Sequence, residues 1–135
     1  RQLTFDCGYS SSALRERIYC STPDGPTPPM AGILIYTASG DSQGSLGGLV
    51  RQGRSPRLAM TILQAIEAIS WCSSDPVCSE LRTGFAGLNI GACHACALVS
   101  ETSCQTSNVL LDRRVLTGDS HLGLNGLFSP LNEFM

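Results

Sequence analysis

The chain has 135 residues, which fits one domain with a hydrophobic core, and 42% of them are hydrophobic while only 15% are charged. The formal net charge is -2, and every basic side chain is an arginine. This balance excludes a polycation that coats nucleic acid through its bulk charge.

No secretion signal and no apolar run of the ~18 residues that a membrane span needs are visible. We therefore expect a cytoplasmic protein that does not contact a membrane. Because the sequence begins at Arg1 and not at a methionine, we interpret residues 1–135 as a single domain excerpted from the C-terminal part of a longer protein.

Two strands are expected in the first third of the chain. Residues 13–20 end in Ile-Tyr-Cys before a turn-rich loop, which favours a strand, although Ser12 could also cap a helix here. Residues 31–38 contain the continuous apolar run Gly-Ile-Leu-Ile-Tyr-Thr, which is typical of a strand buried on both faces. The two strands could pair as a hairpin with a long loop.

Residues 55–71 carry the clearest helical pattern. Ser55 can cap the helix, and Pro56 suits its first position. Polar side chains, Thr61 among them, are expected on the solvent face. A stripe at helical spacing is expected to face the core, and it consists of Leu58, Ile62, Ala65, Ile66 and Ile69.

A last helix is predicted from Thr102, because Thr102 and Gln105 match a capping box. Cys104 would then lie in the first turn, where free N–H groups and the helix dipole stabilise a thiolate. Asn108 would lie one turn further, either supporting Cys104 by a hydrogen bond or exposed on the surface. The segment 112–114, Asp-Arg-Arg, is expected to be exposed or to face a partner.

Five of the seven cysteines fall between positions 72 and 104, and two of them form the knuckle Cys93-His94-Ala95-Cys96. A structural zinc ion takes four tetrahedral ligands, for which thiolates are well suited. The remaining cysteines, Cys7 and Cys20, are expected to be buried structural residues. The predicted zinc ligands are Cys78, Cys93, Cys96 and Cys104, with Cys72 as the alternative to Cys78.

Other chemistries compete with zinc at these cysteines. A disulfide framework fits poorly, since seven is an odd number and no secretion signal is visible. Four thiolates around one ion leave no open position for water, so we expect a structural site and no catalysis. The alternative is a thiol-redox or metal-dependent enzyme that uses the Cys93/Cys96 pair. Besides the cysteines, Arg51, Arg54 and Arg57 form a local basic cluster, which is either solvated or in contact with phosphate.

The stretch Gly91-Ala-Cys-His-Ala-Cys96, followed by Ser103-Cys-Gln-Thr-Ser-Asn108-Val-Leu-Leu-Asp-Arg113, resembles the MrfA-type zinc-binding (MZB) domain family. Ala92 departs from the family pattern, in which the glycine directly precedes the knuckle. Two further stretches, Leu14-Arg-Glu-Arg-Ile-Tyr19 and Trp71-Cys-Ser-Ser-Asp-Pro-Val-Cys78, are similar to members that belong to the DISARM anti-phage defence system.

The resemblance implies a domain that binds zinc through four cysteines and that lies within or beside DNA helicases. It further implies a non-catalytic accessory role, a helicase partner of the DrmA type, and contact with DNA through that partner or through Arg51, Arg54 and Arg57. The expected fold is α/β, with a small β-sheet packed on helices and a C-terminal helical part held by the four-cysteine zinc site.

Overall fold

The computed structural model describes residues 1–38 and 47–129 of the chain. The helices are α1 (Gln2–Cys7), α2 (Gly47–Gln52), α3 (Arg57–Ser70), α4 (Val77–Glu80) and α5 (Arg114–Thr117), with short 3-10 turns η1 (Ser11–Ala13), η2 (Phe85–Gly87) and η3 (Glu101–Ser103). The strands β1 (Leu14–Ser21) and β2 (Met30–Thr37) pair antiparallel, as do β3 (Arg82–Thr83) and β4 (Asn89–Ile90). Helices with small sheets confirm the predicted α/β class. No helix among the described residues has the length and apolarity to cross a membrane.

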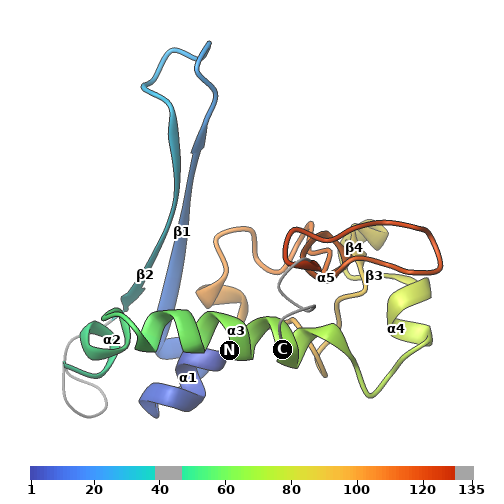
Figure 1. Ribbon diagram of the computed structural model, residues 1–135, viewed down its shortest axis with the longest axis horizontal. Coiled ribbons are helices and arrows are strands. Elements are labelled where there is room, and N and C mark those ends of the chain that lie inside the picture. The colour runs from blue at the N-terminus through green and yellow to red at the C-terminus, as the bar shows by residue number, and fades with distance from the viewer. Residues whose placement is uncertain (39–46, 130–135) are drawn as a thin grey trace.

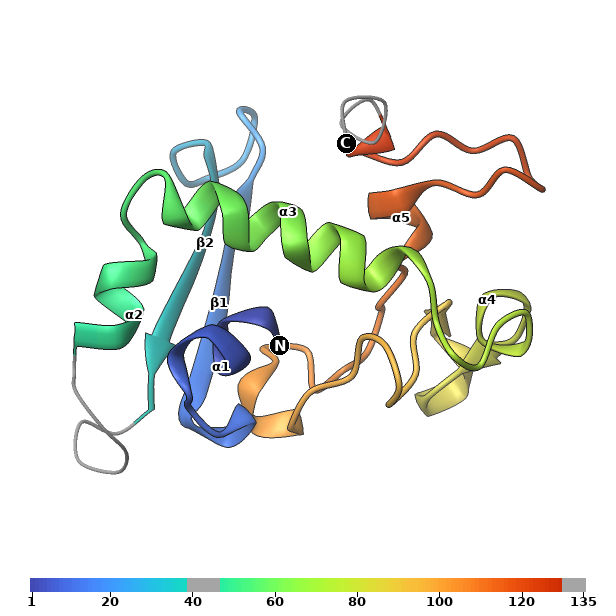
Figure 2. The same cartoon turned by 60° about the horizontal axis from the view of Figure 1, so that its bottom comes forward.

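Helix α3 runs along the molecule from the end that holds α2 and the hairpin to the end that holds α4 (Figures 1 and 2). It confirms the helix predicted at residues 55–71. Ile66 is buried as expected, but Leu58 and Ile62 stay 40% and 44% exposed. The expectation for Thr61 was wrong: it is buried, and its hydroxyl donates to Asp6 Oδ2 over 3.0 Å. Helix α1, which the sequence did not indicate, contacts α3 and supplies this acceptor.

Strands β1 and β2 form the predicted hairpin, in register from Leu14 opposite Thr37 to Ser21 opposite Met30. The hairpin extends away from α3 into solvent (Figure 1). Burial of β2 on both faces was wrong for these residues, because every residue from Met30 to Tyr36 is exposed. Cys20 is also exposed, contrary to its expected role as a buried residue.

The long helix predicted from Thr102 does not form. The segment contains only the 3-10 turn η3 and, after an irregular stretch, the four-residue helix α5. Ser107, Asn108 and Leu110 have φ angles of 50°, 59° and 66°. These are left-handed backbone conformations that a right-handed helix cannot include.

The apolar core of the described residues is small. Its most buried members are Leu14, Ile66, Ala92, Cys72 and Cys78. Two of these are cysteines, and Ala92 directly precedes the Cys93 knuckle. The end of the molecule that holds α4, β3 and β4 therefore has little apolar burial apart from its thiols, which is the situation in which a bound metal contributes to folding.

Candidate metal centre

The first pair of thiols comes from the turn that follows α3. The helix ends at Ser70, and Trp71 is already extended, so Cys72 lies in a loop and not on the helix. The Asp75 N–H donates to the carbonyl of Cys72 over 2.9 Å, and the Cys78 N–H donates to the carbonyl of Ser74 over 2.9 Å. These bonds reverse the chain and bring Cys78, on α4, beside Cys72. Both thiols are buried.

The second pair comes from the knuckle after β4. The N–H groups of Cys96 and Ala97 both donate to the carbonyl of Cys93, over 3.2 and 3.0 Å. The Cys93 N–H donates to Cys96 Sγ over 3.3 Å. The hydroxyl of Thr83 on β3 donates to the carbonyl of Ala92 over 2.6 Å and fixes the knuckle to the small β3–β4 sheet. Two thiols of one tight turn therefore face the first pair.

The four sulfur atoms have the spacing of a tetrahedral metal site. The Sγ–Sγ distances are 3.6 Å for Cys72–Cys93, 3.7 Å for Cys78–Cys96 and 3.8 Å for Cys93–Cys96. All four atoms lie within 4.8 Å of one another. A tetrahedron with metal–sulfur bonds of ~2.3 Å has edges of about 3.8 Å. The residues present thus fit a zinc ion at their centre, with no rearrangement of the chain.

This group differs from the predicted ligand set in two ways. Cys72 and Cys78, which were treated as alternatives, are both present. Cys104 does not belong to the group. It lies near the base of the hairpin, where its thiol is 3.4 Å from Thr106 Oγ1 and it lines a cavity of about 230 Å³ with Leu14 and Ile35. The physical reason is the missing helix, because the segment after η3 turns away at Ser107 and Asn108.

A buried cation lies behind the thiols. Arg113 is only 5% exposed, and its guanidinium forms an ion pair with Asp75 and also donates to the carbonyl of Ile69 over 3.4 Å. The other carboxylate oxygen of Asp75 accepts the N–H of Cys72 over 2.9 Å. Arg113 therefore holds the Cys72 loop through Asp75. The expectation that segment 112–114 is exposed was wrong for Arg113.

The thiols of the cluster differ in acidity. Burial raises the pKa of Cys78, and hydrogen bonds with the neighbouring thiols raise it further. Burial also acts to raise the pKa of Cys93, but hydrogen bonds from the N–H groups of Cys96 and Ala95, together with those from the Cys72 and Cys78 thiols, lower that pKa to about 7. Cys93 thus carries a negative charge more readily than Cys78 or Cys96. A bound divalent cation would deprotonate the others as well.

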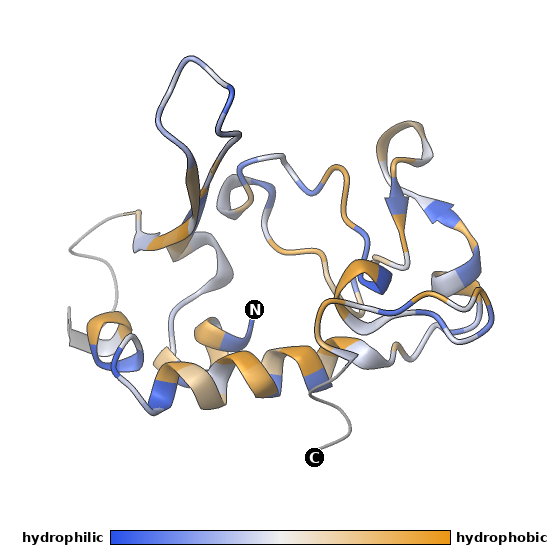
Figure 3. Cartoon of the chain, turned by 45° about the horizontal axis from the view of Figure 1, so that its top comes forward, coloured by the Kyte–Doolittle hydropathy of each residue, from blue (hydrophilic) through white to orange (hydrophobic). Residues whose placement is uncertain are grey.

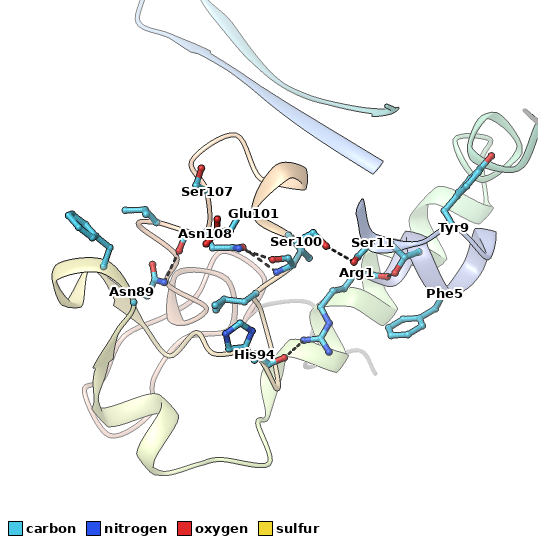
Figure 4. Close-up of a pocket in the computed structure, with 16 residues that line it drawn as sticks. Arg1, Phe5, Tyr9, Ser11, Asn89, His94, Ser100, Glu101, Ser107 and Asn108 are labelled. Atoms are coloured by element: carbon cyan, nitrogen blue, oxygen red, sulfur yellow. Dashed lines mark hydrogen bonds between the residues drawn. The ribbon is translucent and has the colours of Figure 1, made fainter. Parts of the chain in front are cut away.

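Two buried amides hold the polypeptide around the site, and both line a cavity of about 790 Å³ next to the knuckle (Figure 4). Asn89 is 1% exposed; its amide donates to the carbonyl of Asn108 over 2.7 Å and accepts the N–H of Leu111 over 2.9 Å. The Asn108 side chain makes two hydrogen bonds with the backbone of Val99. Asn108 is therefore a supporting residue, but of the Val99 loop and not of Cys104.

Sequence reasoning missed Asp75 and Asn89, and it noted Gly91 only through the family resemblance. Asp75 stands before a proline, which is a turn signal, whereas nothing local marks Asn89 as buried. Gly91 has φ +60°, and a Cβ there would lie 3.1 Å from Cγ of Arg113. The backbone conformation and the close approach of Arg113 thus both favour glycine ahead of the knuckle.

Comparisons with known proteins agree with this geometry. The family model described as "MrfA Zn-binding domain" (MZB) matches residues 1–97. The chain belongs to the MZB domain family. The matched range contains all four clustered cysteines and ends before Cys104. The family and the thiol cluster together make this chain a zinc-binding domain.

A curated relative of this MZB domain is the "DISARM protein DrmB" of Bacillus paralicheniformis. The two are 48% identical over 117 residues, which cover 86% of this chain. The aligned part is only 20% of the length of that protein. The MZB domain is therefore homologous to one part of a defence-system protein.

Proposed function

We propose that Cys72, Cys78, Cys93 and Cys96 hold one structural Zn²⁺ in this domain. The observation that carries the proposal is the set of four thiols at tetrahedral spacing. Four thiolates complete the coordination shell, so no position remains at which water or substrate could be activated. The ion's contribution is to join the Cys72 loop, α4 and the knuckle, which have little apolar burial of their own.

The domain is, on this proposal, a non-catalytic accessory part of a DISARM-type anti-phage defence protein in the cytoplasm. Its zinc-held end keeps the shape that a DrmA-like helicase partner recognises. Homology to DrmB and the closed thiol shell support this role. A thiol-redox enzyme would instead need the Cys93/Cys96 pair free of metal during turnover, and a metal-dependent enzyme would need an open coordination position on the ion.

The experiment uses the full-length protein with its helicase partner. We expect Cys72→Ser to weaken the association at least tenfold in sedimentation or pull-down titrations, while the ATPase rate of the free partner is unchanged. Cys104→Ser is the matched control, because this thiol lies outside the cluster, and it should bind normally. Unchanged association of zinc-free Cys72→Ser would contradict the role. A thiol-redox activity of the wild-type protein that is lost in Cys93→Ser would instead favour the enzyme alternative.

The second part of the proposal is that the domain engages DNA, either through the helicase partner or through Arg51, Arg54 and Arg57. These arginines lie on α2, on the turn after it and at the start of α3, and all are exposed. Within residues 1–38 and 47–129, no carboxylate forms an ion pair with any of them. Free guanidinium groups are suited to phosphate.

Replacing all three arginines by glutamine tests whether the domain itself touches DNA. Direct contact predicts weaker DNA binding by the complex and a salt dependence that flattens by about one unit for each phosphate that an arginine no longer neutralises. The exposed Arg82→Gln is the control and should change neither quantity. An unchanged salt dependence in the triple variant would leave only the partner in contact with DNA.

A further inference from the structure

Strand β2 has one edge that no described segment covers. The β1–β2 sheet has only two strands. In an antiparallel pair, the backbone N–H and C=O groups of every second residue bond to the partner strand, and those of the residues in between point away from it. Ala38 donates to the carbonyl of Ala13 over 2.8 Å, whereas Ile18 points its N–H outward to Gln105 Oε1 over 2.6 Å. These two bonds show which residues of the hairpin direct their backbone N–H and C=O groups away from the partner strand. On β2 these residues are Ala31, Ile33, Ile35 and Thr37.

The outer edge of β1 is treated differently. Besides accepting the N–H of Ile18, Gln105 donates its own N–H to Glu16 Oε1 over 3.1 Å. The Arg15 guanidinium donates to the carbonyl of Thr102. Segment 101–105 thus covers the lower half of β1 with side-chain contacts. Among residues 1–38 and 47–129, no segment covers the β2 edge in this way.

The open edge also lacks the features that normally prevent strands from adding to it. Exposed edge strands usually carry charged residues, prolines or bulges. Residues 30–37, Met-Ala-Gly-Ile-Leu-Ile-Tyr-Thr, contain no charge and no proline, and their register with β1 is unbroken. Ile33 is 70% exposed and Ile35 40% exposed. In Figure 3 the hairpin strands carry hydrophobic colouring mixed with hydrophilic colouring, and the loop that joins them is largely hydrophilic.

Sequence pattern and structure therefore disagree in an informative way. A continuous apolar run is the pattern of a strand covered on both sides. An isolated two-stranded hairpin with wet faces is marginal in water. The relative that this domain matches is about five times as long as the matched part. An added strand would widen this two-stranded sheet, and residues 1–38 and 47–129 do not supply one.

We propose that the open edge of β2 accepts an extended β-strand with apolar side chains, contributed by a segment of the same polypeptide outside residues 1–135. The added strand would bond to the outward N–H and C=O groups of β2 and bury Ile33 and Ile35 against its own side chains. The edge carries no positive charge, so nucleic acid is not its occupant. This surface lies on the hairpin, away from the thiols, and the inference does not depend on zinc.

Residue-resolved hydrogen exchange on the full-length protein tests the proposal. The inward amides of Gly32, Leu34 and Tyr36 bond to β1 and are protected in either case. An added strand predicts that the amides of Ala31, Ile33 and Ile35 exchange at least 100-fold more slowly than unpaired amides. Fast exchange at these outward positions, with slow exchange at the inward ones, would overturn it.

Two substitutions at one position sharpen the result. Ile33→Pro removes an outward donor and leaves the bonds to β1 intact, as tolerated on strand edges. We expect outward protection at Ala31 and Ile35 to fall at least tenfold while inward protection remains. Ile33→Val keeps the donor and is the matched control. Equal protection in the two variants would contradict strand addition.

The same exchange measurement, repeated over a 100-fold dilution of the isolated full-length protein, shows whether the added strand comes from the same polypeptide or from another one. A strand from the same polypeptide gives protection that does not change with concentration. Protection that disappears on dilution, with a dimer seen by light scattering, would replace the proposal by pairing with a second copy. Protection that appears only after the helicase partner is added would equally overturn it.

Discussion

Arg113 and Asp75 form an ion pair directly behind the metal centre, with side chains that are 5% and 20% exposed. Asp75 spans the gap between this cation and the zinc ligands, because its second oxygen accepts the N–H of Cys72. Four thiolates and one zinc ion carry a net charge of -4 + 2 = -2. A buried arginine beside them offsets part of that charge. Burial acts to lower the pKa of Arg113, but the hydrogen bond and the charge of Asp75 raise it, and Cys78 and Cys96 add to this effect. The ion pair thus has two effects: Asp75 holds Cys72 in position, and Arg113 offsets part of the negative charge of the four thiolates.

Arg113→Ala should be strongly destabilising. It leaves Asp75 without its partner and the Cys72 loop without its anchor, and breaking a buried pair from one side costs about 3 kcal/mol. Urea unfolding of the zinc-loaded protein measures the change. Arg114→Ala is the control, since Arg114 pairs with Asp112 and Asp119 nearer the surface, and we expect at most about 1 kcal/mol there. Equal losses in both variants would argue against the anchoring role of Arg113.

The Asp75 pair also predicts a pH dependence. The hydrogen bond from Arg113 lowers the pKa of Asp75 below its ordinary value. A carboxyl group whose pKa is lower in the folded state stabilises the fold above its unfolded pKa of ~3.9, and that stabilisation is lost as the pH falls through the folded pKa. The stability difference between wild type and Asp75→Asn should be constant above about pH 5 and shrink below about pH 4. Because Asp75 also accepts the N–H of Cys72, the zinc content of both proteins is measured at each pH. A difference that does not vary with pH would exclude the ion pair.

Gly91→Ala separates backbone strain from a side-chain clash. The new methyl group would meet Arg113 at 3.1 Å in a residue with φ +60°. Gly123→Ala is the matched control, because Gly123 has φ +64° but no atom within 4 Å of the added Cβ. The control should cost about 1 kcal/mol from the left-handed conformation alone. We expect a larger loss at Gly91, measured by thermal unfolding, together with faster zinc release to a chromogenic chelator. Equal losses would mean that Arg113 simply moves aside.

Asn89→Ala should loosen the segment that follows the knuckle. The substitution leaves the Leu111 N–H and the Asn108 carbonyl without their buried partner, and such losses cost about 2–3 kcal/mol. Asn125→Ala, at an exposed position, is the control and should be close to neutral. Hydrogen exchange of the Leu111 amide gives a local readout and should become faster. Normal protection of that amide in Asn89→Ala would contradict the assigned bond.

Local patterns were sufficient for the elements whose cause is local. The β1–β2 hairpin and helix α3 follow from apolar periodicity and turn residues within each segment. The predicted helix from Thr102 failed because its capping-box signal was overridden by distant partners. Asn89 and Asn108 bond to backbone groups of other segments, and those bonds accompany the left-handed residues that end any helix there.

The sequence predicted a metal centre made of four thiols, but it did not predict which four cysteines cluster in the structure. Cysteine spacing and the knuckle indicated a four-thiol site. Cys72 and Cys78 were predicted as alternatives, whereas the turn after α3 brings both thiols into the group. Cys104 was favoured by the helix that does not form. The anchoring pair of Asp75 and Arg113 joins residues 38 positions apart, which no local pattern can connect.

Zinc content of single cysteine variants tests the central claim most directly. The full-length protein and its Cys72→Ser, Cys78→Ser, Cys93→Ser, Cys96→Ser and Cys104→Ser variants are dialysed against a weak chelator and analysed for metal by mass spectrometry. We predict about one zinc per chain in wild type and in Cys104→Ser, as expected of one closed four-ligand site, and a large loss in each of the other four. Retention of zinc in Cys72→Ser together with loss in Cys104→Ser would contradict the account.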